Sequence, residues 1–331
     1  MKIITFAAIK GGVGKTTLAF NFGEWLARKG YQVLFLDLDH QCNLTQTYGI
    51  YDDTDTVANI FKGEGDVKVI PIKQNISLIP GYMQLDTIEK SLENKVNKDM
   101  LLYMWLEDHY EDKRLDLFDY VIIDCHPDFS TATRNAIAVS HSIISPIIPS
   151  EHGYNAKFNL EDRLESFRQE VINYRTRESY ITAQLYFIPN MIKHNTSSSK
   201  SLLETLNKTE EEGRILSPDT QEVVYIPQKE LFNKSTMDKQ SIFEMAEEFD
   251  ELLDDEITTV TLTYTDDLIV PEIADREGIH ILERAGNQLV LEYSCSVKEV
   301  KDYLSSYGLP RHPERISFEF SIHEGSENDN L

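Results

Sequence analysis

Residues 10–17 read Lys-Gly-Gly-Val-Gly-Lys-Thr-Thr, and residue types in this order could hold phosphate groups. Glycines let successive backbone N–H groups approach an anion closely, and a helix that starts behind them adds a partial positive charge. Lys15 is placed to reach the β- and γ-phosphates of a nucleotide, and the Thr16 hydroxyl is placed to bind Mg²⁺. We therefore predict a site for a nucleoside triphosphate. The residues expected around its phosphates are Gly11, Gly12, Val13, Gly14, Lys15, Thr16 and Thr17.

The segments on either side of this motif fit the same chemistry. Residues 3–9 form an apolar run that predicts a buried strand, and residues 16–29 follow a helical pattern. A strand, a glycine-rich turn and a helix together are the usual construction of a phosphate-binding loop. The strict pattern G-x-x-x-x-G-K-[ST] fails at its first position, where Ile9 stands, and a second lysine, Lys10, comes directly before the glycines.

Two further predicted strands end in carboxylates. The run 32–39 ends with Asp37 and Asp39, and the run 119–124 ends with Asp124 after four apolar residues. Because parallel strands bring their carboxyl ends to one edge of a sheet, we expect these side chains near Lys15. A carboxylate at such a strand end lies near Mg²⁺ in many phosphoryl-transfer sites. The predicted metal ligands, some acting through water, are Thr16, Asp39 and Asp124.

With these motifs the chain resembles the ParA/MinD family of ATPases, whose phosphate-binding loop carries two lysines, and within it the ParA/Soj-like partition ATPases. Residues 37–43 read Asp-Leu-Asp-His-Gln-Cys-Asn and resemble the family pattern D-x-D-P-Q, with His40 in the proline position. Residues 124–127 resemble the pattern D-T-x-P, with Cys125 in the threonine position.

Looser similarities follow further along the chain, so that the resemblance covers about residues 1–255. Residues 145–151 resemble the family strand that ends in P-x-x-P, and residues 187–190 end in the asparagine that helps to read the base. Residues 223–228 resemble the segment I-P-x, whose backbone flanks adenine. The resemblance therefore adds Asn190 and Pro227 to the expected nucleotide contacts.

The same resemblance implies an activity. It predicts a homodimer that forms on ATP, with Lys10 reaching the partner's nucleotide, and hydrolysis that stays slow until a ParB-like protein stimulates it. Asp39 resembles the residue that orients the attacking water. The expected catalytic residues are thus Lys10, Lys15 and Asp39, and the expected cofactors are ATP and Mg²⁺.

The hydrophobic periodicity predicts an α/β fold: a mainly parallel, twisted sheet with helices on both faces, as in P-loop NTPases. We expect this domain over residues 1–255, a small α+β interaction module over 256–323, and a disordered tail over 324–331. The predicted strands are 2–9, 32–39, 75–79, 119–124, 142–148, 182–188, 222–226, 258–264, 288–293 and 315–322. The predicted helices are 16–29, 85–95, 98–111, 156–173, 199–207, 241–256 and 297–307.

Composition limits the cellular setting. The chain has 331 residues, of which 41% are hydrophobic, and no apolar run approaches the roughly 20 residues that a membrane span needs. It starts directly with a predicted strand, so we expect no signal peptide and a cytoplasmic location. Three widely spaced cysteines form neither a disulfide framework nor a metal site. The helix predicted over 241–256 is acidic, whereas MinD-type membrane helices are basic, so we expect no membrane attachment.

Charge separates the candidate functions. The formal net charge of −24 opposes a DNA backbone, although local patches can override it because salt screens distant charges. The candidate DNA contacts, which could equally be ordinary solvated lysines, are Lys193, Lys200, Lys229, Lys234 and Lys239. We expect an ATPase that segregates or positions DNA cargo and associates with the nucleoid if it binds DNA. The alternative is a MinD-like or orphan ATPase that positions a protein complex, and a metabolic P-loop enzyme is a third class.

Overall fold

A computed structural model describes residues 1–193, 196–208, 213–217, 220–245, 257–264, 279–285, 288–293, 303 and 316–322. The chain divides into two compact units, Met1–Ile242 and Phe243–Leu331, which are taken separately below. The boundary predicted after residue 255 falls in a stretch that lies outside the described residues, and so does the predicted disordered tail. Both stay predictions.

The first unit is built on a seven-stranded sheet with the strand order β3-β4-β2-β5-β1-β6-β7. Its strands are β1 (Lys2–Phe6), β2 (Val33–Leu38), β3 (Ile70–Lys73), β4 (Ile76–Ile79), β5 (Tyr120–Cys125), β6 (Ser142–Ile147) and β7 (Gln184–Pro189). Every neighbouring pair is parallel except β3 and β4, which pair antiparallel at one edge. The predicted fold class, a mainly parallel sheet of the P-loop NTPase kind, is confirmed.

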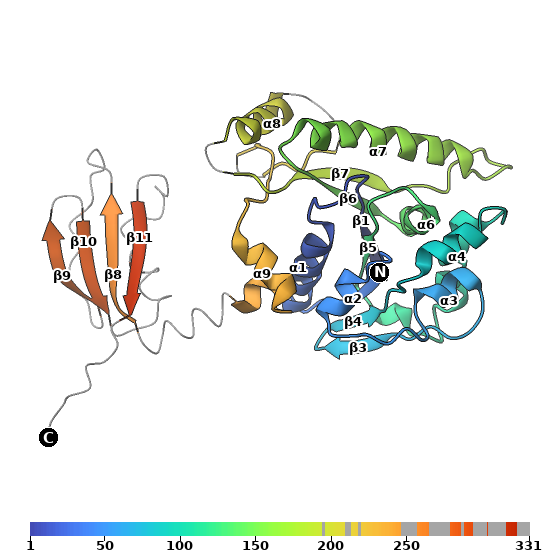
Figure 1. The fold of residues 1–331 in the computed structure, drawn as a ribbon, viewed down its shortest axis with the longest axis horizontal. Coiled ribbons are helices and arrows are strands. Elements are labelled where there is room, and N and C mark those ends of the chain that lie inside the picture. The colour runs from blue at the N-terminus through green and yellow to red at the C-terminus, as the bar shows by residue number, and fades with distance from the viewer. Residues whose placement is uncertain are drawn as a thin grey trace, which may run out of the picture. The chain divides into compact units, whose positions relative to one another are not determined.

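Helices cover both faces of this sheet (Figure 1). They are α1 (Lys15–Arg28), α2 (Asn43–Thr47), α3 (Val57–Lys62), α4 (Leu85–Ser91), α5 (Leu101–Asp108), α6 (Thr131–Val139), α7 (Glu151–Glu170), α8 (Ser197–Lys208) and α9 (Glu230–Met237). Strand β2 shows why two layers form, since all six of its residues are buried and successive side chains point to opposite faces. Val33 and Phe35 join a core with apolar residues of α1, whereas Leu34 and Leu36 join a core with α3, α5 and α6.

The register of the central strands sets the position of the site. Asp37 of β2 lies opposite Asp124 of β5, and Phe6 of β1 lies opposite the same aspartate. The carboxyl ends of three adjacent strands therefore meet at one edge, where the loop from β1 to α1 also begins.

One predicted strand of this unit is wrong. Residues 222–226 form no strand, and Val223 makes only an isolated bridge to Leu216. The reason is that the segment changes partner along its length: the Val224 N–H bonds to the Ile215 carbonyl, and the Ile226 N–H bonds to the Pro189 carbonyl. The sequence patterns also missed β3, α2, α3, α6 and α9.

The second unit contains a four-stranded antiparallel sheet with the order β11-β8-β10-β9. Its strands are β8 (Ile257–Tyr264), β9 (Ile279–Ala285), β10 (Gln288–Tyr293) and β11 (Ile316–Ile322). Strand β9 was not predicted. The predicted helix 241–256 is described, and is helical, only over 242–245, and most of the predicted helix 297–307 lies outside the described residues. Within the described part of the chain, no helix combines the length and apolarity that crossing a membrane requires.

Candidate nucleotide site

The loop between β1 and α1 takes a shape that only glycine accommodates easily. Gly12 and Gly14 have positive φ angles of 71° and 89°, in the left-handed region that side chains disfavour. Gly14 is the N-cap residue of α1, and a Cβ atom added to it would lie 2.5 Å from Asn190 Nδ2. The loop thus brings bare backbone to the N-terminus of α1, where N–H groups attract an anion.

Lys15 and Thr16, the first two residues of α1, lie beside the end of β5. Lys15 is buried, with only 6% of its surface exposed. The Thr16 hydroxyl donates a hydrogen bond of 2.6 Å to Asp124 Oδ2, whereas the buried Asp124 Oδ1 has no hydrogen-bond partner among the described residues. Burial raises the pKa of Asp124 well above its ordinary value, and the nearby charge of Asp37 adds to this effect. A buried carboxylate oxygen without a partner beside a hydroxyl fits a cation such as Mg²⁺, which prefers oxygen ligands.

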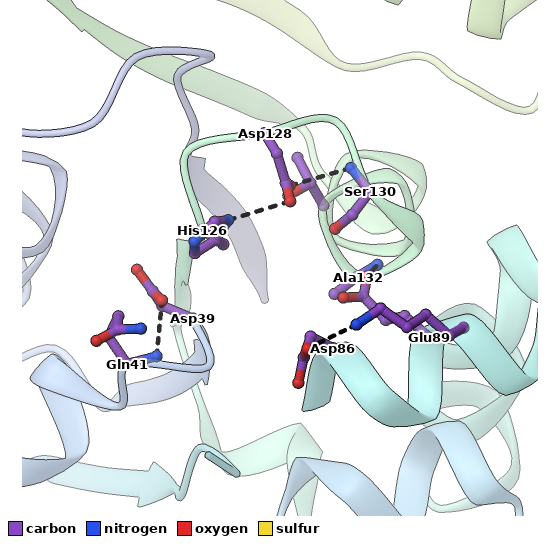
Figure 2. A network of polar contacts seen from close by, with 10 residues as sticks. Asp39, Gln41, Asp86, Glu89, His126, Asp128, Ser130 and Ala132 are labelled. Atoms are coloured by element: carbon purple, nitrogen blue, oxygen red, sulfur yellow. Dashed lines mark hydrogen bonds and ion pairs between the residues drawn. The ribbon is translucent and has the colours of Figure 1, made fainter. Parts of the chain in front are cut away.

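The two carboxylates at the end of β2 have different surroundings. Asp37 is fully buried: its Oδ2 accepts hydrogen bonds from the Thr45 backbone and hydroxyl at 2.9 and 2.7 Å, and its Oδ1 accepts one from the Asp39 N–H. Burial raises the pKa of Asp37 to about 6. Asp39 accepts a 2.8 Å bond from the Gln41 N–H and lines the cavity (Figure 2). Asp37 therefore shapes the turn, and Asp39 faces the space where a ligand would lie.

A cavity of about 680 Å³ lies over these groups, within the volume range of small-molecule sites. It is lined by Gly12, Gly14, Lys15, Thr16, Thr17, Asp39, Gln41, Asn43, Gln46, Thr47, Tyr51, His126, Pro127, Thr236 and Met237. Of the predicted phosphate and metal residues, Gly12, Gly14, Lys15, Thr16, Thr17 and Asp39 share this space, whereas Gly11, Val13 and Asp124 do not line it. Pro127 comes from the loop after β5 and lies 3.6 Å from the position that a Cβ on Gly11 would take.

A smaller cavity of about 70 Å³ is also lined by Gly14. It brings together Asn190 and Pro227, which are distant in sequence and were both predicted as nucleotide contacts. The Ile192–Pro227 bridge holds the two segments side by side, and the Asn190 amide donates 2.7 Å to the Val13 carbonyl. The segment after β7 is therefore attached directly to the phosphate loop.

Lys10 is separate from this arrangement. It does not line the large cavity, and its Nζ donates 3.3 Å to the Ser150 hydroxyl. The structure therefore does not bring Lys10 together with Lys15.

The five candidate DNA lysines are all exposed, but they fall into two groups. Lys193 and Lys200 belong to α8 and the segment before it. Lys229, Lys234 and Lys239 lie just before, within and just after α9. These helices lie apart in Figure 1. Lys239 also contacts Tyr51, lying 5.6 Å from the ring centroid and 3.4 Å from the hydroxyl.

Several cavity residues were not predicted as site residues. Thr236 and Met237 come from α9, far from any motif, and Tyr51 follows the short helix α2. His126 lies in the Asp-Cys-His-Pro motif, and its ring stacks on His40 with a centroid distance of 4.0 Å. The sequence singled out His40, because it stands where the family pattern has proline. No sequence pattern indicated that His40 would contact His126.

Residues 1–177 match the AAA domain family. The chain is 29% identical over 255 residues to an uncharacterized protein of Methanocaldococcus jannaschii, and the alignment covers 73% of this chain and 91% of that protein. It is 37% identical over 152 residues to the sporulation initiation inhibitor protein Soj of Bacillus subtilis, covering 44% of this chain and 58% of Soj. It is 26% identical over 226 residues to a probable plasmid-partitioning protein ParA of Thermus thermophilus, covering 66% of each chain.

Solved structures share the fold of the first unit. Apo McdA of Cyanothece has a TM-score of 0.64 at 22% identity, and the likeness covers 76% of this chain and 95% of that one. A putative plasmid partition protein of Borrelia burgdorferi bound to AMPPNP has a TM-score of 0.59 at 22% identity, covering 75% and 98%. Cobyrinic acid a,c-diamide synthase of Mycobacterium smegmatis with ADP and magnesium has a TM-score of 0.57 at 24% identity, covering 76% and 94%. Proteins of this fold thus bind AMPPNP in one case and ADP with magnesium in another.

Proposed function

The chain belongs to the ParA/Soj-like family of partition ATPases, and from this premise we propose that it is an ATP-driven dimer that positions DNA cargo. One observation carries the ATPase assignment. Next to the buried Lys15, the Thr16 hydroxyl bonds to a buried Asp124 whose other oxygen has no partner among the described residues. A buried cation and a buried carboxylate at one strand end fit a metal-bound triphosphate better than any neutral ligand.

The residues divide the work of hydrolysis between them. The backbone of Gly12 and Gly14 and the Lys15 amine would hold the phosphates, and Thr16 and Asp124 would hold Mg²⁺, with Asp39 contributing through water. When bound, Mg²⁺ offsets the negative charge that develops on the phosphate oxygens. Asp39 faces the cavity from a turn that the Gln41 N–H keeps fixed, so its carboxylate orients the attacking water.

The placement of Lys10 supports a dimer. This lysine does not line its own cavity, and we propose that its charge reaches the nucleotide of a second copy. We expect Lys10→Ala to bind ATP nearly normally but to lose the ATP-dependent dimer and most hydrolysis. Light scattering with ATP and with ADP measures this, and a Lys10→Ala protein that still dimerises on ATP would contradict the proposal.

The cargo is tested by DNA binding. Pairing two copies doubles the exposed lysines on one assembly, and this favours binding of DNA only in the ATP state, despite the acidic total. DNA affinity should be measured with ATP, ADP and no nucleotide across a salt series. We expect binding only with ATP, a steep fall of log affinity with log salt, and no sequence preference.

Charge-reversal variants locate the DNA-binding surface. We expect replacement of Lys229 and Lys234 by Glu to reduce both the affinity and the salt slope while ATP binding persists. The same change at Lys62 and Lys95, which are exposed elsewhere on the unit, serves as the control for net charge.

The alternative is an ATPase that positions a protein complex. The net charge of −24 favours this alternative because it attracts a basic protein partner. The four-stranded unit favours it because it offers a further surface on which such a partner could bind. Absence of DNA binding by the ATP dimer, even at low salt, would favour this alternative. We propose in either case that a ParB-like protein stimulates hydrolysis, and that the protein is cytoplasmic and joins the nucleoid only if it binds DNA.

A further inference from the structure

Two histidines that lie far apart in sequence meet beside the nucleotide cavity, and one of them, His126, lines it. His40 follows the end of β2 and His126 follows the end of β5, and their rings stack at 4.0 Å with an interplanar angle of 30°. Asp39 lies beside them. One ligand atom from each of the three side chains lies within 4.8 Å of the others.

His126 is held in an orientation that suits a metal ligand (Figure 2). Its Nδ1 atom lies 3.1 Å from Asp128 Oδ2, and Asp128 itself accepts bonds from the Ser130 N–H and the Thr133 hydroxyl. A carboxylate at Nδ1 keeps the ring proton there and leaves Nε2 to bind a metal, as in many zinc sites.

The donor set differs from that of the Mg²⁺ site. Two imidazoles and a carboxylate suit Zn²⁺ and its neighbours among the transition metals, whereas Mg²⁺ prefers oxygen alone. Bonds to Zn²⁺ are about 2.0–2.2 Å and point to the corners of a tetrahedron, so its ligand atoms lie about 3.4 Å apart. The three ligand atoms, which lie within 4.8 Å of one another, would have to close by up to about 1.4 Å, which side-chain rotations provide.

We propose that Asp39, His40 and His126 form a second metal site, for Zn²⁺ or a similar divalent transition metal, at the wall of the nucleotide cavity. A metal held there occupies Asp39, so it slows ATP turnover without removing the contacts of the phosphate loop. This consequence for turnover rests on the proposed function, whereas the site itself does not.

The site is tested with nucleotide-free, full-length protein. Co²⁺ serves as the spectroscopic probe, and Zn²⁺ binding is followed by calorimetry in excess Mg²⁺. We expect the visible spectrum of Co²⁺ coordinated by imidazole, and its loss when Zn²⁺ is added. His40→Phe keeps a ring stacked on His126 but removes the ligand atom, so its Zn²⁺ affinity should fall by at least about 100-fold. Asp128→Asn should cost about 10- to 100-fold, the usual effect of a group that orients a ligand.

A matched control lies elsewhere in the same unit. His109 also stacks on an aromatic ring, that of Trp105 at 5.1 Å, so His109→Phe makes the same exchange away from the cavity. We expect its Zn²⁺ affinity to match that of the wild type. Equal Zn²⁺ affinity for His40→Phe and the wild type would overturn the site, and so would an equal loss in His109→Phe.

Turnover is measured separately, so that the two proposals can fail independently. Zn²⁺ should slow Mg²⁺-dependent ATP hydrolysis by the wild type more than hydrolysis by His40→Phe. If the protein binds Co²⁺ through His40 but never hydrolyses ATP, the proposed function fails and the site stands. If hydrolysis is normal and Zn²⁺ does not bind, the site fails alone.

Discussion

The strands of the seven-stranded sheet carry different polar groups at their two ends, called here the amino edge and the carboxyl edge of the sheet. At the amino edge, Asp119 accepts a 2.9 Å bond from the Gln32 N–H, and His141 Nδ1 accepts a 3.1 Å bond from the Ile3 N–H. At the carboxyl edge, Asp37, Asp39 and Asp124 are all buried, and one Asp124 oxygen has no partner among the described residues. The same strands therefore end in satisfied groups on one side and in a cluster of buried carboxyl groups on the other.

This difference distinguishes a structural edge from a functional one. A buried charge without a partner costs free energy in the folded protein, so such groups persist where a ligand supplies the missing contact. At the amino edge every bond named above closes within the protein, and no ligand is required. Substitutions at the carboxyl edge should therefore change ligand binding, and substitutions at the amino edge should change stability alone.

The largest effect is expected for Lys15→Ala. This substitution removes the buried amine that faces the β- and γ-phosphates, so ATP affinity should fall by more than about 100-fold, roughly 2.7 kcal/mol. Calorimetry with Mg²⁺ and ATP measures it. Lys29→Ala, at the opposite end of α1, is the control and should bind as the wild type does. Wild-type affinity in Lys15→Ala would remove the phosphate-loop assignment.

Asp124→Asn tests the unpartnered carboxylate. Since the substitution removes a buried charge, the ligand-free protein should melt at a temperature no lower than the wild type. The additional stabilisation of the wild type by Mg²⁺ with ATP, about 2.7 kcal/mol at 100 times Kd, should be lost. Thermal melts with ATP, with and without Mg²⁺, measure both effects. A variant that keeps the Mg²⁺-dependent shift would show that Asp124 does not hold the metal.

A smaller effect is expected for Asp39→Ala, which should bind ATP but turn over at least about tenfold more slowly, roughly 1.4 kcal/mol of barrier. Phosphate release measures the rate. Asp39→Asn keeps an oxygen for the Gln41 N–H, so it separates loss of charge from loss of the turn. Should both variants hydrolyse at the wild-type rate, the water-orienting role belongs to another residue.

The smallest effect belongs to the amino edge. Burial and the positive charges of Lys2 and the N-terminus lower the pKa of His141, which must stay neutral to accept the Ile3 N–H. The unfolded chain therefore binds this proton more readily, and stability is lost as pH falls below about 6.5. Because the side chain is exposed, the loss should stay below about 0.5 kcal/mol, or a Tm shift under about 2 °C.

His141→Gln provides the comparison for this pH effect. Its amide oxygen can accept the same bond without titrating, so the difference in Tm between about pH 7.5 and pH 5.5 should be smaller than in the wild type. ATP affinity should not change. A change in ATP affinity would contradict the division between the two edges.

The sequence predicted the phosphate side of the site because that side is local. Residues 10–17 specify the loop by themselves, and the apolar runs before Asp37 and Asp124 identify buried parallel strands without any partner being known. Strand order then brings these ends together by a general rule of α/β sheets. The predicted contacts at Thr16 and Lys15 therefore required no knowledge of distant pairing.

The remaining features depend on contacts between distant segments. Helix α9 supplies Thr236 and Met237 because Ser235 bonds to Asn21 on α1, a pairing that no local pattern indicates. Residues 222–226 have the composition of a strand, but their hydrogen bonds go to several segments instead of one. The pairing of His40 with His126 depends on β2 and β5 being neighbours.

The position of β1 between β5 and β6 also affects synthesis of the chain. Lys2–Phe6 is translated before both of its hydrogen-bonded neighbours, Tyr120–Cys125 and Ser142–Ile147. At about 5–20 residues per second, roughly 6 to 30 s pass before both have been made. Until then the strand lacks at least one of its native neighbours, and the glycine loop behind it lacks full support. The phosphate loop is thus translated well before the strands that hold it in its native shape.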